Sequence, residues 1–179
     1  ALYTNTTGDY NTAVGRYALR LNTTANGNSA LGHRALTSNT TGGRNIALGK
    51  DSLYTNTTGN YNTALGYSSL QDNTTASNNT ALGYFSLKAN TTGTQNAAVG
   101  SFSLDASTTA SYNTAVGYNA GSTITTGSSN VAIGRAALQN VTTGVANVAV
   151  GQSALANQSG STSNNTAVGT QALSANTTG

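Results

Sequence analysis

The chain has 179 residues, of which 36% are hydrophobic and 6% are charged, and its formal net charge is +3. With seven Lys and Arg in all, it lacks the dense basic stripe of a nucleic-acid surface. The absence of cysteine excludes a disulfide framework and a thiolate metal site. The absence of proline, together with the sparse charge, argues against the usual composition of a disordered chain.

Glycine marks a repeat that runs through the whole sequence. Successive glycines of this repeat are 17 residues apart eight times and 18 residues apart once. In chain order they are Gly15, Gly32, Gly49, Gly66, Gly83, Gly100, Gly117, Gly134, Gly151 and Gly169. A fixed period of this length is typical of solenoids, in which each module buries its apolar face only against its neighbours.

The residues before each glycine are expected to form a short strand. Thr12-Ala13-Val14 near the start and Val131-Ala132-Ile133 near the end are strand formers bounded by turn formers. A second turn signal, Asn-Thr-Thr followed by Gly or Ala, separates successive strands, and the apolar positions do not recur at helical spacing. The sequence therefore predicts an all-β fold over residues 1–179. It is a single parallel β-solenoid domain with one 17-residue repeat per coil and about ten coils, stacked about 4.8 Å apart.

Alternation along the strands separates two faces. Alanine stands two residues before every glycine of the repeat, shares a face with the asparagine two residues earlier, and suits a narrow interior. The aliphatic residue directly before the glycine then points outward, and such a row of apolar side chains usually marks an interface. The alternative is a self-contained solenoid in which the aliphatic residue points inward. The row, a predicted oligomer interface, consists of Val14, Leu31, Leu48, Leu65, Leu82, Val99, Val116, Ile133, Val150 and Val168.

The one irregular spacing lies between Gly151 and Gly169. There the segment 157–161 replaces the usual Asn-Thr-Thr-Gly turn. We expect a one-residue bulge in this coil, with undisturbed strands on either side.

The Asn-Thr-Thr segments allow two interpretations. Each is a formal N-glycosylation sequon, which predicts a glycan-coated rod. Alternatively, the asparagines form a ladder whose side-chain amides hydrogen-bond from coil to coil. Ser107, Ile124 and Val141 replace asparagine in later coils, which favours the ladder. The sequon asparagines are Asn5, Asn22, Asn39, Asn56, Asn73, Asn90 and Asn176.

Catalytic and metal-binding chemistry has few residues to draw on. The single histidine, His33, occupies a variable position, and the four aspartates are scattered. Asp51 lies one coil after Arg34, and Asp105 one coil after Lys88, so we expect cross-coil ion pairs. The sequence therefore predicts a protein that is not an enzyme and needs no cofactor or metal.

Two further surfaces suggest a binding module as the alternative function. A regular threonine array could bind ice or a crystalline polysaccharide, although adjacent threonines point opposite ways and leave one rank outward. Tyr67, Tyr84 and Phe85, with Phe102 and Tyr118 nearby, are expected to pack between coils or to contact carbohydrate.

Two phrases carry a family resemblance. The segments 113–120 and 130–137, Asn-Thr-Ala-Val-Gly-Tyr-Asn-Ala and Asn-Val-Ala-Ile-Gly-Arg-Ala-Ala, resemble the YadA-like head repeats of trimeric autotransporter adhesins. The longer pattern that ends in Asn-Thr-Thr-Gly is similar to repeats of phage tail-fibre proteins. The resemblance covers essentially the whole chain, although this repeat is longer than the usual repeat of the family.

The resemblance implies a left-handed parallel β-roll that trimerises through its aliphatic face. It also implies a segment of an extracellular fibre, at a cell surface or on a virion, that serves as an adhesin head or a tail-fibre shaft. Because the chain begins and ends inside the repeat, we expect it to be part of a longer fibre. The expected partners are further copies, as a homotrimer or a head-to-tail fibre, and a cell-surface glycan. No nucleic acid and no membrane segment are expected.

Overall fold

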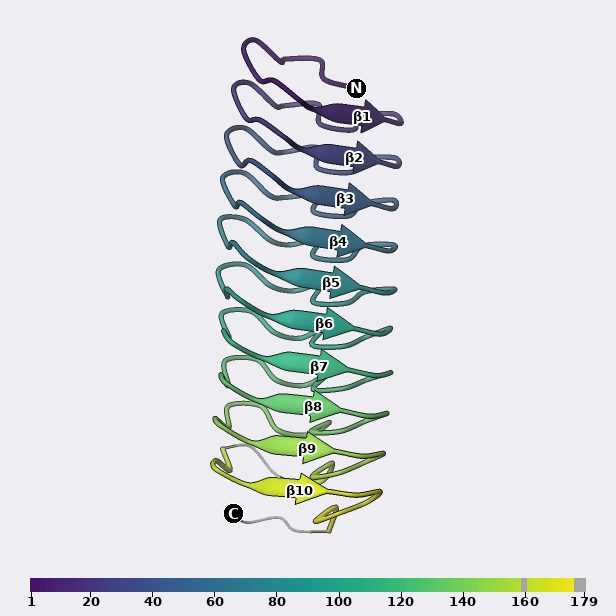
Figure 1. Cartoon of the computed structure of the whole chain (residues 1–179), viewed down its shortest axis with the longest axis vertical. Coiled ribbons are helices and arrows are strands. Elements are labelled where there is room, and N and C mark those ends of the chain that lie inside the picture. Colours follow the sequence, from purple (N-terminus) through teal and green to yellow (C-terminus); the bar gives the residue numbers. More distant parts are fainter. Residues whose placement is uncertain (159–160, 176–179) are drawn as a thin grey trace.

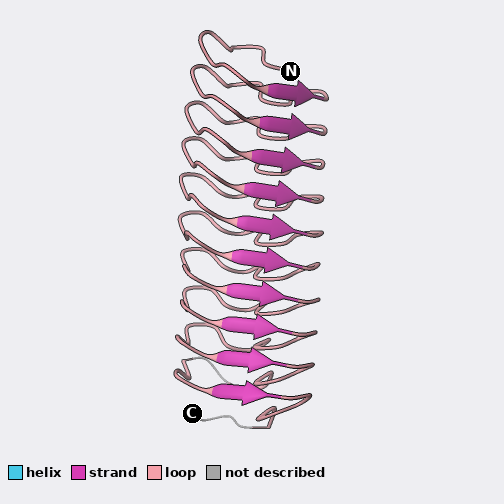
Figure 2. Cartoon of the chain, viewed as in Figure 1, coloured by secondary structure: helices cyan, strands magenta, loops and turns pink. Residues whose placement is uncertain are grey.

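The structure is a computed structural model that describes residues 1–158 and 161–175. These residues form a rod of stacked coils with one short strand per coil, all on one side of the stack (Figure 1). The remainder of each coil is loop and turn (Figure 2). The strands are β1 (Thr12–Val14), β2 (Ser29–Leu31), β3 (Ile46–Leu48), β4 (Thr63–Leu65), β5 (Thr80–Leu82), β6 (Ala97–Val99), β7 (Thr114–Val116), β8 (Val131–Ile133), β9 (Val148–Val150) and β10 (Thr166–Val168). The predicted all-β solenoid is confirmed.

The ten strands form one parallel sheet in chain order. Each residue pairs with its equivalent in the next coil, as Leu65 does with Leu82. The longer spacing before β10 leaves this register intact, since Val148 still pairs with Thr166. The strands on either side of the irregular coil are therefore undisturbed, as expected. Residues 159 and 160, within the expected bulge, lie outside the described residues.

Small and aliphatic side chains fill the narrow interior. The central alanine of every strand points inward, and it is buried in β2 to β10 and partly buried in β1. A second column, four residues after the repeat glycine, holds fully buried leucines in eight of the ten coils: Leu19, Leu36, Leu53, Leu70, Leu87, Leu104, Leu138 and Leu155. Burying one such leucine contributes roughly 1.5–3 kcal/mol. The prediction that alanine points inward and its aliphatic neighbour outward is confirmed.

One coil lacks this leucine, and an isoleucine fills the space in the core instead. Gly121 takes its place, and a Cβ at Gly121 would lie 3.0 Å from Cδ1 of Ile124. Ile124 occupies the column that holds asparagine in the earlier coils, and it is fully buried. Its side chain fills the space that the missing leucine leaves.

Leucine also adopts a backbone conformation that its residue type disfavours. The φ angles of Leu19 and Leu138, for example, are 47° and 51°, in the left-handed region. This region costs a residue with a Cβ about 1 kcal/mol or more. Full burial of the side chain offsets that cost. Each of these leucines therefore forms part of a turn through its backbone and part of the core through its side chain.

Buried asparagines at the start of each strand form a first hydrogen-bonded ladder. The backbone N–H of Asn79 donates to Oδ1 of Asn62 at 3.0 Å, and its Nδ2 donates to the carbonyl of Gly93 at 2.9 Å. Its Oδ1 accepts from the backbone N–H of Asn96 at 2.9 Å. Asn79 therefore links its coil to both neighbouring coils, and the same bonds recur at Asn45, Asn62, Asn96, Asn113 and Asn130.

The asparagines of the Asn-Thr-Thr segments form a second ladder. Nδ2 of Asn73 donates to Oδ1 of Asn56 at 2.7 Å, and Nδ2 of Asn90 donates to Oδ1 of Asn73 at 2.9 Å. The ladder stops at Asn90 because Ser107 follows. Oδ1 of Asn90 and Oγ of Ser107 are both buried without a hydrogen-bond partner. Buried polar atoms of this kind cost about 1–3 kcal/mol each.

Replacing Ser107 with asparagine is expected to raise the free energy of unfolding by about 1 kcal/mol. The new Nδ2 would donate to Asn90 Oδ1 and to the carbonyl of Ala110, as in the earlier coils. One unpartnered oxygen would remain, on the new side chain, in place of the present two. Chemical denaturation measures the change, with Ser107→Ala as the control because it leaves Asn90 Oδ1 without a donor. Equal stability of the two variants would contradict this account.

Candidate functional site

The predicted interface residues lie on the outer face of the sheet. Seven of the ten are exposed, with exposed fractions from 37% at Val99 to 70% at Val168, and the other three are partly exposed. The first residue of each strand points to the same face. Ile46, Val131 and Val148 therefore widen the row in β3, β8 and β9. No charged residue stands in either column.

The sequon asparagines lie inside the rod. Asn22, Asn39, Asn56, Asn73 and Asn90 have no exposed surface, while Asn5 is partly buried and Asn176 lies outside the described residues. The atom that would carry a glycan is Nδ2. In Asn56 it donates to Asn39 Oδ1 at 2.8 Å and to the carbonyl of Gly59 at 3.1 Å. This corrects the glycosylation hypothesis for the five buried asparagines, because a glycan there would require the ladder to open.

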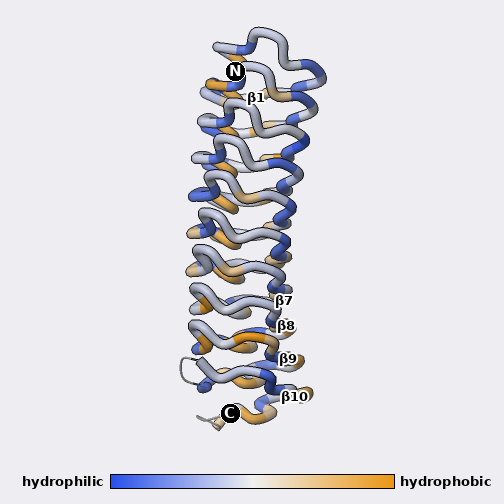
Figure 3. Tube along the Cα trace, turned by 90° about the vertical axis from the view of Figure 1, so that its left-hand side faces the viewer, coloured by the Kyte–Doolittle hydropathy of each residue, from blue (hydrophilic) through white to orange (hydrophobic). Residues whose placement is uncertain are grey.

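The two threonines of each turn differ in role. The hydroxyl of the first donates to a carbonyl of the next coil, as Thr57 Oγ1 does to Thr74 at 3.0 Å. The second threonine is exposed, as at Thr58 and Thr75. One threonine rank therefore faces outward, as the alternation predicted. The side of the rod from which the strands begin is pale or blue in most coils when coloured by hydropathy (Figure 3).

Aromatic side chains stack along the corner that follows the repeat glycine. The ring centroids of Tyr67 and Tyr84 lie 5.4 Å apart, with an angle of 18° between the ring planes. The ring centroids of Tyr84 and Phe85 lie 4.1 Å apart. Phe102 and Tyr118 continue the series, with ring centroids 6.1 Å apart. The predicted packing between coils is confirmed.

One of the two expected ion pairs forms. Nε of Arg34 lies 2.6 Å from Oδ1 of Asp51, and this hydrogen bond raises the pKa of the Arg34 guanidinium. Lys88 forms no such pair with Asp105 among the described residues. Its Nζ lies 5.1 Å from the ring centroid of Phe85 instead. Burial raises the pKa of the Asp105 carboxyl, although backbone N–H groups and the charge of Lys88 act in the other direction.

The other candidate sites give little chemistry. His33 is half-buried, with its ring 6.2 Å from that of Tyr17. In the described part of the chain, no group of three or more His, Cys, Asp or Glu side chains could hold a metal ion. Over the same residues, no helix has the length and apolar character to cross a membrane.

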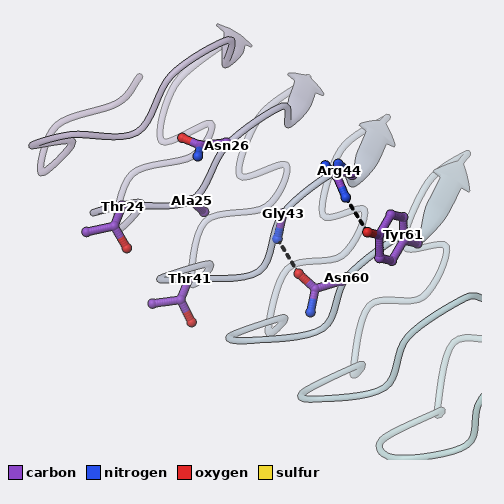
Figure 4. A pocket seen from close by; sticks show the side chains of 8 residues that line it. All are labelled: Thr24, Ala25, Asn26, Thr41, Gly43, Arg44, Asn60 and Tyr61. Carbon is purple, nitrogen blue, oxygen red and sulfur yellow. Dashed lines mark hydrogen bonds between the residues drawn. The ribbon is translucent and has the colours of Figure 1, made fainter.

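A pocket of about 220 Å³ lies at the corner where successive coils enter their strands (Figure 4). No motif of the sequence predicted this pocket. The signal that could have indicated it is Gly43, which stands between Asn26 and Asn60 in a column of mostly polar side chains. The residues that line the pocket are Thr24, Ala25, Asn26, Thr41, Gly43, Arg44, Asn60 and Tyr61.

These observations define a β-solenoid repeat protein with an uncharged, largely aliphatic sheet face. No family model matches the chain, and no curated protein or solved structure matches it.

Proposed function

We propose that the chain is a non-catalytic rod segment of an extracellular fibre, at a cell surface or on a virion. It associates with other copies through the face that carries the aliphatic row. The work of such a segment is mechanical, since it spaces or presents a binding part at a distance. The family resemblance of the repeat supports the extracellular setting.

The exposed aliphatic row is the observation that carries the proposal. It continues through every coil without a charged residue, whereas the interior is already filled by the alanine and leucine columns. Monomeric soluble proteins rarely leave so long a contiguous apolar surface open to water. A second copy of the same rod matches it in length and pitch.

A homotrimer is the proposed arrangement. Copies that run parallel and in register would bring equivalent aliphatic residues together in every coil, and closed cyclic symmetry leaves no row uncovered. The end coils of a solenoid present unpaired strand edges, which supports head-to-tail growth as a second contact.

The triple variant Leu48→Thr, Leu65→Thr and Leu82→Thr tests lateral association. Threonine suits an exposed strand position, so the coils are expected to remain folded. Association should weaken by roughly a thousandfold or more, since each replacement removes about 1.4 kcal/mol of apolar burial. Light scattering gives the mass of each protein. The matched control is Thr41→Ser, Thr58→Ser and Thr75→Ser, on the exposed threonine rank, which should keep the wild-type mass. A wild-type chain that stays a dispersed monomer would contradict the proposal.

A further inference from the structure

The pocket at Gly43 lies on the corner that leads into β3, and none of its lining residues belongs to the aliphatic row. Figure 4 shows residues of three successive coils around it. Gly43 lies in the middle coil, with Asn26 and Asn60 at the equivalent positions on either side. The pocket is therefore separate from the proposed lateral contact between copies.

A hydrogen-bonding rule in this column explains why the pocket exists. In six of the nine steps between described coils, the backbone N–H of this column donates to a side-chain oxygen of the equivalent residue in the next coil. Asp9 donates in this way to Asn26 Oδ1 at 2.6 Å, Gly43 to Asn60 Oδ1 at 2.7 Å, and Asn60 to Ser77 Oγ at 2.9 Å.

Gly43 cannot accept such a bond because it has no side chain. No hydrogen bond among the described residues uses the N–H of Asn26 as donor. A Cβ on Gly43 would lie 3.9 Å from that nitrogen and 3.1 Å from the carbonyl oxygen of Asn26. The place where the neighbouring coils put a side-chain oxygen is thus an open notch with a backbone donor beside it.

The walls of the notch are fixed by other contacts. The guanidinium of Arg44 donates to the hydroxyl of Tyr61, and its Cζ lies 5.3 Å from the centroid of the Tyr61 ring. Nδ2 of Asn60 donates to the carbonyl of Thr58 at 2.9 Å, which holds this side chain in place. The ring of Tyr61 is about half exposed.

The opposite wall carries hydroxyl groups. Thr24 and Thr41 are exposed members of the threonine rank, and both line the pocket. The lining contains no acidic side chain, and its one cation, Arg44, is already engaged with Tyr61. The site therefore suits an uncharged ligand rich in oxygen better than a multiply charged anion.

We propose that this notch binds one pyranose unit of a saccharide. A sugar hydroxyl oxygen supplies the acceptor that the Asn26 N–H lacks, and further hydroxyls exchange hydrogen bonds with Thr24 and Thr41. The C–H groups on one face of the sugar pack against the Tyr61 ring. The volume of about 220 Å³ is below that of pockets for drug-sized ligands, which fits a single ring.

Saturation-transfer NMR with the methyl glycosides of glucose, galactose, mannose and N-acetylglucosamine tests this proposal. At least one of them should receive saturation from the wild-type protein. The variant Gly43→Ser should lose the binding by about tenfold or more, because its Oγ fills the notch and accepts from Asn26 N–H. Ser77 and Ser111 occupy the same column, so this variant is expected to fold.

Two further variants keep the test selective. Tyr61→Ala should also lose binding, since it removes the aromatic wall. Thr92→Ala, two coils beyond the pocket on the exposed threonine rank, should bind as the wild type does. Circular dichroism establishes that each variant is folded. Absence of transfer to all four glycosides, or equal transfer with Gly43→Ser, would overturn the proposal without bearing on lateral association.

Discussion

Replacing Gly83 with alanine is expected to lower the free energy of unfolding by about 4 kcal/mol or more. The φ angle of Gly83 is 138°, a conformation that residues with a Cβ rarely adopt. An added Cβ would also lie 2.6 Å from the carbonyl carbon and oxygen of Gly100 in the next coil. Backbone atoms cannot move aside without breaking the register of the sheet. Chemical denaturation followed by circular dichroism measures the loss.

Gly27→Asn is the matched control for this substitution. Gly27 also has a positive φ, 71°, but an added Cβ there meets only Cγ of Arg44, at 3.6 Å. Arg44 and Tyr61 hold the same position in the next two coils, each with φ of 58°. The control should stay within about 1 kcal/mol of the wild type, because asparagine tolerates this region. If both variants were equally stable, the close contact between repeat glycines of neighbouring coils could not be what fixes the backbone conformation of the coil.

Replacing Asn79 with valine is expected to cost about 2–4 kcal/mol. The substitution removes the Nδ2 bond to the carbonyl of Gly93 and the Oδ1 acceptor for Asn96. The backbone N–H of Asn96 would then be buried without a partner. A thermal or denaturant unfolding curve measures the effect.

The control for this prediction is Asn90→Val, in the second ladder. Asn90 ends that ladder, and its Oδ1 already lacks a donor. Valine there would leave Asn73 Oδ1 unpartnered instead, so the number of unpartnered oxygens would not change. Val141 stands in the same column in a later coil and is fully buried. We expect a cost of about 1 kcal/mol or less. A loss as large as that of Asn79→Val would show that the ladders do not act as described.

Period and residue type were enough to predict the coil and its two faces. The strand alternation placed Ala64 inside and Leu65 outside, because successive side chains must point to opposite faces. The spacing of 17 residues also predicted that Asp51 would lie beside Arg34. These features depend on the backbone path alone, which a regular repeat determines.

Side-chain direction and local strain could not be predicted in the same way. Lys88 and Asp105 stand in neighbouring coils, yet the lysine packs over Phe85, because equivalent positions bring Cα atoms together without orienting the side chains. Leucine in the left-handed region contradicts its own preference, and only the burial of the finished core explains it. The notch at Gly43 depends on a hydrogen-bonding rule between coils that the sequence does not contain.

Site-specific crosslinking tests lateral association through the aliphatic row most directly. The chain has no cysteine, so Leu82→Cys introduces a single thiol near the middle of the row. A short bismaleimide should join copies of this variant efficiently. It should leave Thr92→Cys, on the exposed threonine rank, largely unlinked. Efficient linkage at position 82 alone is the result expected if copies associate through this face. Equal linkage at both positions, or none at position 82, would contradict it.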